Sequence, residues 1–320
     1  MLPRIIYMGT PDFAVAPLKA LCEAGYPIAC VVTVPDKPAG RGLKLRPSPV
    51  KEYALEQSLP ILQPENLRDE AFVQALQALD SELGVVVAFR KLPKVVYSIP
   101  RLGFFNLHAS LLPQYRGAAP INRAIMNGER ESGVSTFLLS DTIDAGAVLL
   151  QARCPISSEM TAGELHDALA VLGAPLVVKT VEGLVQGTLR PTEQVVTETL
   201  RPAPKIFRAD CKVDWTQNAE QIHDFIRGLS PYPGAWATLC IGAKQEEVKL
   251  FDSFLLPSST VQAASVAGTI AIHPDRNSLV ITTGHHTCLH IASIQPAGKR
   301  RMSVHDFLLG IQTEELKFLS

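Results

Sequence analysis

The chain of 320 residues is 47% hydrophobic and carries a formal net charge of −1 at pH 7. This length predicts about two domains, and this hydrophobic content can fill two cores. The balanced charge excludes a uniformly basic protein, but it is compatible with a local basic face.

The apolar run, the N-terminal segment and the cysteine spacing further restrict the class of protein and its location. The longest apolar run, residues 168–178, is too short to span a bilayer and contains Pro175. A strand-like segment at residues 5–8 leaves no room for a leader peptide. The six cysteines form no Cys-x-x-Cys motif. We therefore expect a monomeric cytoplasmic protein that has no membrane partner and no bound metal.

The first part of the chain alternates between strand and helix patterns. After the strand at 5–8, Thr10 and Pro11 are suited to begin a helix that ends at Gly25. The next predicted elements are a strand at 28–34, a helix after Ser48, a helix at 66–79 and a buried strand at 85–89. This order predicts an α/β fold with a doubly wound, mostly parallel sheet, in which ligands bind beyond the carboxyl ends of the strands.

Residues 34–51 concentrate positive charge in a segment rich in glycine and proline. Asp36 is the only acid there, and the five cations are Lys37, Arg41, Lys44, Arg46 and Lys51. This excess predicts a mobile arm that contacts phosphate groups, with an ordinary solvated loop as the alternative.

Polar side chains cluster at the end of a strand predicted at residues 103–108. Asn106 and His108 are two residues apart, so they project from the same face of that strand. An amide donor beside an imidazole suits acyl or one-carbon transfer, in which a carbonyl oxygen gains negative charge while a proton moves. A hydrogen-bonded core histidine is the alternative.

The segment Asn-Leu-His-Ala-Ser-Leu-Leu-Pro-Gln-Tyr-Arg-Gly at 106–117 resembles the folate-dependent formyltransferases at every fixed position of their motif. The Asp-Ala-Gly at 144–146 matches their second motif. The resemblance implies a Rossmann-like formyltransferase domain with Asn106, His108 and Asp144 as catalytic residues, Asp141 being a less favoured carboxylate. Asn106 and His108 would donate hydrogen bonds to the developing oxyanion, and Asp144 would orient His108.

The same resemblance implies a folate co-substrate, 10-formyltetrahydrofolate, as the formyl donor. Its contacts would be made by Ser110, Leu111, Leu112, Pro113, Phe89 and Arg90. Two positions depart from the family pattern: Phe89-Arg90 stands where Tyr-Gly is usual, and Asn122-Arg123 stands where Gln-Trp is usual. The first departure puts the backbone contacts near the pteridine in question.

The rest of the chain predicts a long helix, a linker and a second domain. Thr161 and Glu164 form a capping box at the start of the helix, and Thr216 is predicted to cap a later helix. Several short strands follow it, and the resemblance implies that they form a small OB-like β-barrel. The predicted division is a catalytic domain at 1–189, a linker at 190–205 and a C-terminal tRNA-binding domain at 206–320.

The arm and the segment 289–310 resemble the members of the family that formylate methionyl initiator tRNA for translation initiation. The resemblance implies tRNA contacts by Lys37, Arg41, Lys44 and Arg46. A formyltetrahydrofolate hydrolase, or a formyltransferase acting on a nucleotide sugar or glycinamide ribotide, would share the catalytic residues without needing the arm. Two further alternatives are an RNA-binding protein without activity and a nicotinamide-dependent oxidoreductase, although residues 9–13 lack two glycines of the dinucleotide fingerprint.

Overall fold

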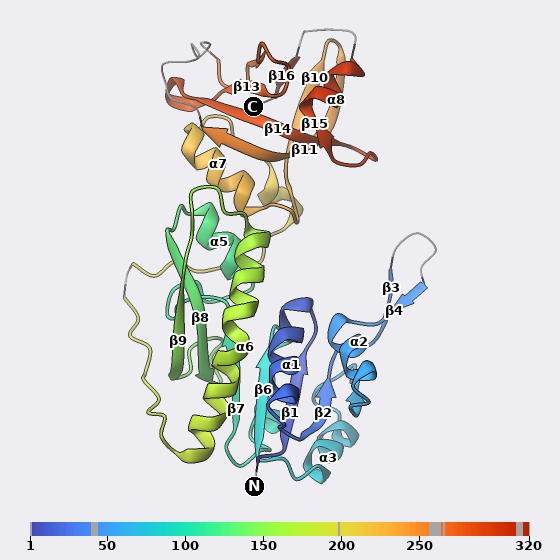
Figure 1. The fold of residues 1–320 in the computed structure, drawn as a ribbon, viewed down its shortest axis with the longest axis vertical. Helices are drawn as coiled ribbons and strands as arrows, with labels where there is room; N and C mark the ends of the chain where they lie inside the picture. The colour runs from blue at the N-terminus through green and yellow to red at the C-terminus, as the bar shows by residue number, and fades with distance from the viewer. Residues whose placement is uncertain are drawn as a thin grey trace. The chain divides into compact units, whose positions relative to one another are not determined.

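The computed structural model describes residues 2–39, 44–197, 199–255, 264, 266–311 and 316–319. Its first sheet contains seven strands (Figure 1). Their bounds are β1 Ile5–Gly9, β2 Ile28–Val32, β5 Ile61–Leu62, β6 Leu83–Val87, β7 Phe104–His108, β8 Glu131–Leu138 and β9 Val148–Pro155. The strands are adjacent in the order β5-β2-β1-β6-β7-β8-β9.

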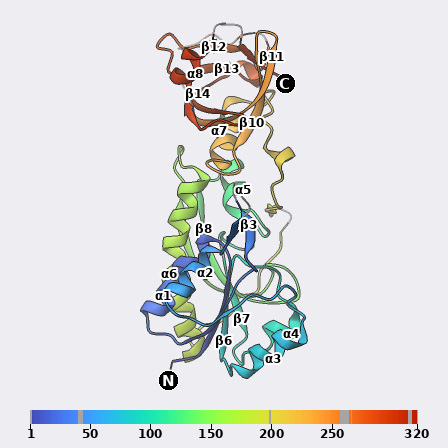
Figure 2. The ribbon, with the colours of Figure 1, turned by 90° about the vertical axis from the view of Figure 1, so that its right-hand side faces the viewer.

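The strands from β5 to β7 are parallel, whereas β8 and β9 are antiparallel additions at one edge. The predicted mostly parallel sheet is therefore confirmed. α1 (Val15–Glu23) and α6 (Ala162–Gln186) lie on one face, and α3 (Glu70–Ala78) and α4 (Lys94–Tyr97) lie on the other (Figure 2). Both faces are covered, so β1, β2 and β6 are buried along their whole length.

Two predicted helix starts are confirmed by their side-chain caps. Ser48 Oγ accepts a hydrogen bond from Lys51 N at 3.1 Å at the start of α2 (Pro49–Glu56). Thr161 and Glu164 bond reciprocally at the start of α6, with Thr161 N donating to Glu164 Oε2 at 2.8 Å and Glu164 N donating to Thr161 Oγ1 at 3.2 Å. These caps satisfy backbone N–H groups that have no partner within the helix.

Two other predicted starts are wrong. A short 3₁₀ turn, Asp12–Ala14, precedes α1, which begins at Val15 and not after Thr10. Asn218 caps α7 (Ala219–Gly228) in place of Thr216, because the Thr216 hydroxyl donates instead to Asp214 Oδ1 at 2.7 Å.

The C-terminal strands form the predicted small barrel. The strand order is β12-β13-β14-β11-β10-β16, and an isolated pairing of Thr269 with Lys317 joins the two ends of that order. Trp215 is fully buried in its core and stacks on Phe318, with ring centroids 4.7 Å apart. The bounds are β10 Ala235–Ile241, β11 Lys244–Leu255, β12 Ile270–Ile272, β13 Leu279–Thr282, β14 Cys288–Pro296, β15 Met302–Ser303, α8 Val304–Leu309 and β16 Leu316–Phe318.

Residue contacts divide the chain into two compact units. The first comprises residues 1–120, 131–155 and 166–203, and the second comprises 121–130, 156–165 and 204–320. Residues 190–203 therefore belong to the unit that contains the first sheet. Two short segments of the predicted catalytic domain, 121–130 and 156–165, belong to the unit that contains the barrel. Hydrogen bonds within each unit account for this division.

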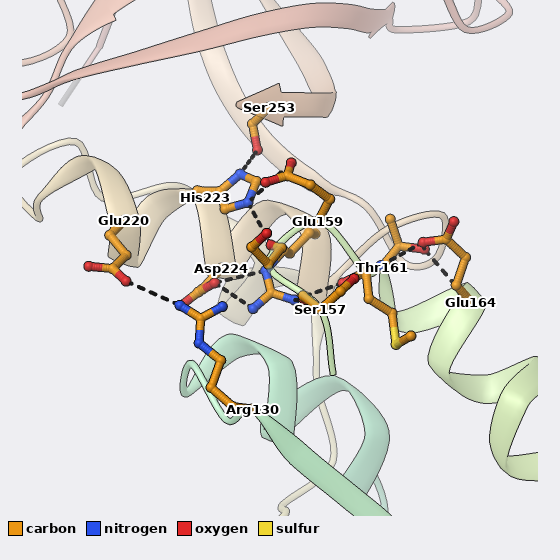
Figure 3. A network of polar contacts seen from close by, with 12 residues as sticks. Arg130, Ser157, Glu159, Thr161, Glu164, Glu220, His223, Asp224 and Ser253 are labelled. Carbon is orange, nitrogen blue, oxygen red and sulfur yellow. Dashed lines mark hydrogen bonds and ion pairs between the residues drawn. The ribbon is translucent and has the colours of Figure 1, made fainter. Parts of the chain in front are cut away.

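A buried polar network holds the short segments of the second unit to α7 (Figure 3). Arg227 Nε donates to Asp224 Oδ1 at 2.7 Å, and Arg227 Nη1 donates to the Met160 carbonyl at 2.7 Å. His223 bonds to Ser253 Oγ through Nδ1 at 2.9 Å and to the Ser158 carbonyl through Nε2 at 3.1 Å. α7 therefore presents charged side chains to segment 156–165 as well as apolar ones to the barrel core.

α6 is long and apolar enough to cross a membrane by length and composition alone. However, Leu169, Val177 and Val181 on this helix are fully buried within the fold. This burial is typical of a core helix.

Candidate active site

Strand β7 carries the two polar side chains that the sequence singled out. It lies between β6 and the antiparallel β8, near the middle of the sheet. Asn106 is half-buried, whereas the His108 side chain is buried at the carboxyl end of the strand. Alternation along the strand places both on one face, as predicted.

His108 has a defined hydrogen-bond partner. Its Nε2 lies 2.9 Å from the carbonyl oxygen of Tyr115, and the ring contacts Phe137 edge-on with centroids 6.4 Å apart. A carbonyl oxygen can only accept, so Nε2 carries the hydrogen. Nδ1 is therefore the nitrogen that can take a proton in the neutral ring.

Asn106 differs from most buried amides because one of its atoms is unsatisfied. Its Oδ1 is buried, and among the described residues it has no hydrogen-bond partner. A buried polar atom without a partner costs about 1–3 kcal/mol, so a bound molecule that supplies the partner gains from it. An oxygen without a partner is expected at a site where the substrate donates the missing hydrogen bond.

Asp144 sits in a strained turn and faces the loop that follows β7. Its backbone is in the left-handed region at φ +51°, and its Oδ2 accepts a hydrogen bond from Gly117 N at 3.0 Å. Gly117 itself has φ +128°, and a Cβ there would lie 2.4 Å from the Ala203 carbonyl oxygen. Only glycine fits at this position.

His108 and Asp144 are each hydrogen-bonded to the main chain of the same short loop. His108 Nε2 bonds to the Tyr115 carbonyl, and Asp144 Oδ2 bonds to Gly117 N. Among the described residues these are the hydrogen bonds of the two side chains, so the orientation of His108 by Asp144 stays a prediction.

The rival carboxylate, Asp141, is engaged elsewhere. Tyr97 Oη donates to Asp141 Oδ1 at 2.5 Å, and this bond raises the pKa of the Tyr97 phenol. The pairing ties the end of α4 to the loop after β8.

Residues 110–113, predicted to contact folate, are supported from β8 and β9. Ser135 Oγ donates to the Ser110 carbonyl at 2.6 Å and accepts from Leu112 N at 3.0 Å. Gln151 Nε2 donates to both the Leu112 carbonyl and Ser135 Oγ, at 2.9 and 2.8 Å. The sequence analysis missed Ser135 and Gln151, although Ser135 lies directly opposite His108 in the sheet register. Leu111 and Pro113 remain half-exposed.

The Arg90 side chain makes contacts that the glycine usual at this position in the family could not make. The Arg90 guanidinium donates to the carbonyls of Glu65 and Pro64, both at 2.8 Å, and lies 5.2 Å from the centroid of the Phe89 ring. These bonds occupy the guanidinium within the 64–65 turn. Asn122, at the other departure, donates to the Gly228 carbonyl at 2.8 Å.

The basic arm is a hairpin in the described residues. β3 (Lys37–Ala39) pairs with β4 (Lys44–Arg46) in antiparallel fashion. The two strands lie near α2 (Figure 1). Arg41 and the Lys44 side chain lie outside the described residues. The single acid of the window, Asp36, pairs with Lys51 at 2.7 Å, and this bond, followed by one from Gln63, lowers the pKa of Asp36.

Lys37 and Arg46 are directly opposite each other on this hairpin, and both are exposed. Within the described ranges neither has an ion-pair partner. Two like charges opposite each other destabilise a strand pair. A bound anion would relieve that repulsion.

Comparisons with known proteins match both units. A family model described as formyl transferase matches residues 3–181, and one described as formyl transferase, C-terminal domain, matches residues 205–312. The chain belongs to the formyl transferase family. It is therefore an enzyme with a folate-derived formyl donor, and the candidate catalytic residues lie within the first matched region.

Relatives with this arrangement include two named methionyl-tRNA formyltransferase. That of Bacteroides thetaiotaomicron is 47% identical, covering 98% of this chain and 97% of its own. That of Bacteroides fragilis is 48% identical, covering 98% and 96%. The structure of HypX from Aquifex aeolicus in complex with tetrahydrofolic acid has a TM-score of 0.64 at 17% identity, covering all of this chain and 51% of that one, which shows the shared fold.

Proposed function

We propose that this formyl transferase moves the formyl group of 10-formyltetrahydrofolate to the α-amino group of methionine esterified to initiator tRNA. The product, N-formylmethionyl-tRNA, would serve translation initiation. The relatives' names support the acceptor, and the unsatisfied Asn106 amide beside His108 carries the chemistry. A new N–C bond forms to the formyl carbon, the bond from that carbon to N10 breaks, and the amine proton replaces it on the folate.

The roles of the side chains follow from their hydrogen bonds. Asn106 Oδ1 has no partner among the described residues and would accept a hydrogen bond from the amine, while the N–H of the same amide would stabilise the formyl oxygen as it becomes anionic. His108 Nε2 is held by Tyr115, so Nδ1 takes the amine proton and returns it to N10. Asp144 is held by Gly117 in the same loop that holds His108 and would place its carboxylate at the site.

The test is transfer of labelled formyl from 10-formyltetrahydrofolate with four acceptors run in parallel. These are methionyl initiator tRNA, free methionine, an amino nucleotide sugar and buffer alone. We expect product only with the charged tRNA. Folate deformylation in buffer alone would indicate a hydrolase, and formylation of the sugar would indicate a different acceptor class.

The hairpin of Lys37 and Arg46 is proposed to contact the tRNA backbone. Phosphate near the two opposed cations would relieve their repulsion, and Lys51 is already neutralised by Asp36. Arg41 and Lys44 belong to the same proposal on the basis of the sequence alone.

Arg46→Glu is expected to raise KM for methionyl-tRNA by about 10- to 100-fold, because a charge-assisted contact is worth about 1.5–3 kcal/mol. The new carboxylate lies opposite Lys37 and should leave the hairpin at least as stable. The slope of log K against log salt should fall by about 1. Lys19→Glu, at an exposed position of α1, is the control and should leave KM unchanged. An unchanged KM for Arg46→Glu would exclude this contact.

A further inference from the structure

Gln194 joins the two loops that carry the candidate catalytic groups, and neither the family motifs nor the sequence analysis marks it. Its Nε2 donates to the Asp144 carbonyl at 3.0 Å and to the Gly146 carbonyl at 2.7 Å. Its Oε1 accepts from Arg116 Nε at 3.0 Å and from Arg116 Nη2 at 2.7 Å. The amide thus uses both its N–H groups and accepts two bonds, which is all that it can form.

The burial pattern around Gln194 is the reverse of the usual one. Val195 and Val196 are 74% and 66% exposed, whereas the polar Gln194 is turned inward and half-buried. Because the side chains of Val195 and Val196 are exposed, hydrophobic burial contributes little to the stability of this conformation. The conformation of this segment is therefore governed by polar contacts such as those of Gln194.

The rest of this segment is bonded to the start of β9 and to the loop after β7. Thr192 exchanges two backbone hydrogen bonds with Val148, both at 2.8 Å. Tyr115 N donates to the Arg201 carbonyl at 2.7 Å, and Ala203 N donates to the Arg116 carbonyl at 2.8 Å. We call residues 192–203 the strap, since these bonds attach it on both sides of Gln194.

We propose that Gln194 is a positioning residue for formyl transfer. It holds two carbonyls of the left-handed turn at Asp144 and fixes Arg116, whose neighbours Tyr115 and Gly117 hold His108 and Asp144. A left-handed non-glycine residue costs about 1–2 kcal/mol, so this turn needs such external bonds to persist. Gln194 sets where the carboxylate and the imidazole lie without touching the substrate.

The test compares Gln194→Met, which keeps the side-chain length but removes every hydrogen bond, with Glu193→Met at the exposed neighbouring position. We expect Gln194→Met to lower kcat about 10- to 100-fold, because a displacement of about 1 Å at a reacting group costs about 100-fold. KM for the acceptor should change less than threefold, because a misplaced catalytic group weakens stabilisation of the transition state and not binding of the acceptor. Glu193→Met should match the wild type.

Gln194→Glu is a second test variant. It retains an acceptor for Arg116 but places oxygen against the carbonyls of Asp144 and Gly146, so we expect kcat to fall at least as far. In both variants the loss should fall on kcat and not on KM, because the acceptor is bound by other residues. A kcat per folded molecule equal to that of the wild type in Gln194→Met would overturn the proposal.

This inference rests on the proposed function, but the two can fail separately. If the wild type formylates an acceptor other than methionyl-tRNA, the proposed acceptor is wrong, while the same variants measured with the true acceptor still test Gln194. A raised KM with unchanged kcat would contradict the positioning role even when methionyl-tRNA is the acceptor.

Discussion

Replacing His108 by alanine is expected to lower kcat for formyl transfer by about 100- to 10,000-fold, the range for loss of a general acid–base group. The imidazole is buried and its Nε2 is held by the Tyr115 carbonyl, so the alanine variant loses a group that is fixed in place at the site. KM for methionyl-tRNA should stay within about threefold, because the role proposed for His108 is proton transfer and not tRNA binding. Steady-state kinetics with limiting tRNA measures both quantities.

The control for this substitution is His166→Ala. His166 lies on α6 in the same unit, is 28% exposed at its side chain and contacts Phe13 with ring centroids 5.4 Å apart. We expect kcat of this variant to stay near that of the wild type. If His108→Ala keeps its activity, the histidine is a structural core residue, which is the alternative considered at the outset.

Asp224→Asn is expected to destabilise the second unit by about 3–5 kcal/mol, because it leaves the Arg227 guanidinium buried without a counter-charge. The Arg227 side chain is 3% exposed and that of Asp224 is 10% exposed. At about 2–4 °C per kcal/mol for a unit of this size, the melting transition should fall by roughly 6–20 °C. Calorimetry should show the loss in the transition of the barrel unit.

A matched exposed ion pair provides the comparison. Lys19 and Glu23 on α1 lie 3.8 Å apart with side chains 58% and 65% exposed. Glu23→Gln should change the free energy of unfolding by less than about 0.5 kcal/mol, since water screens such pairs. Equal effects of Asp224→Asn and Glu23→Gln would show that burial of the Arg227 pair has no energetic consequence.

The sequence predicted the parts of the site that depend on local pattern. Residues 104–108 alternate as a strand should, so Asn106 and His108 were correctly placed on one face. The Ser48 and Thr161 caps were equally local signals. The Thr216 cap failed because Asp214, two residues earlier, competes for the hydroxyl, and side-chain competition of this kind is not visible in a capping pattern.

The contacts of Asp144 could not be predicted in the same way. They depend on left-handed backbone at Asp144 and Tyr115. Aspartate adopts this conformation more often than most residues but only occasionally, and tyrosine rarely does, so neither residue type predicts it. Residues 190–205, which include the strap, were predicted to be a linker because Pro191, Pro202, Pro204 and the polar residues between them are typical of one. Its bonds to Tyr115 and Arg116 are long-range main-chain contacts, for which the sequence has no periodic signal.

The division into units has a consequence for how such enzymes can be recombined. The chain passes from one unit to the other at residues 120/121, 130/131, 155/156, 165/166 and 203/204. A chimera joined at residue 204 would therefore bring a foreign α7 to the native Met160 and Ser158 carbonyls, which here satisfy Arg227 and His223. A transplanted barrel would keep its own contacts to these segments only if residues 121–130 and 156–165 are transplanted with it.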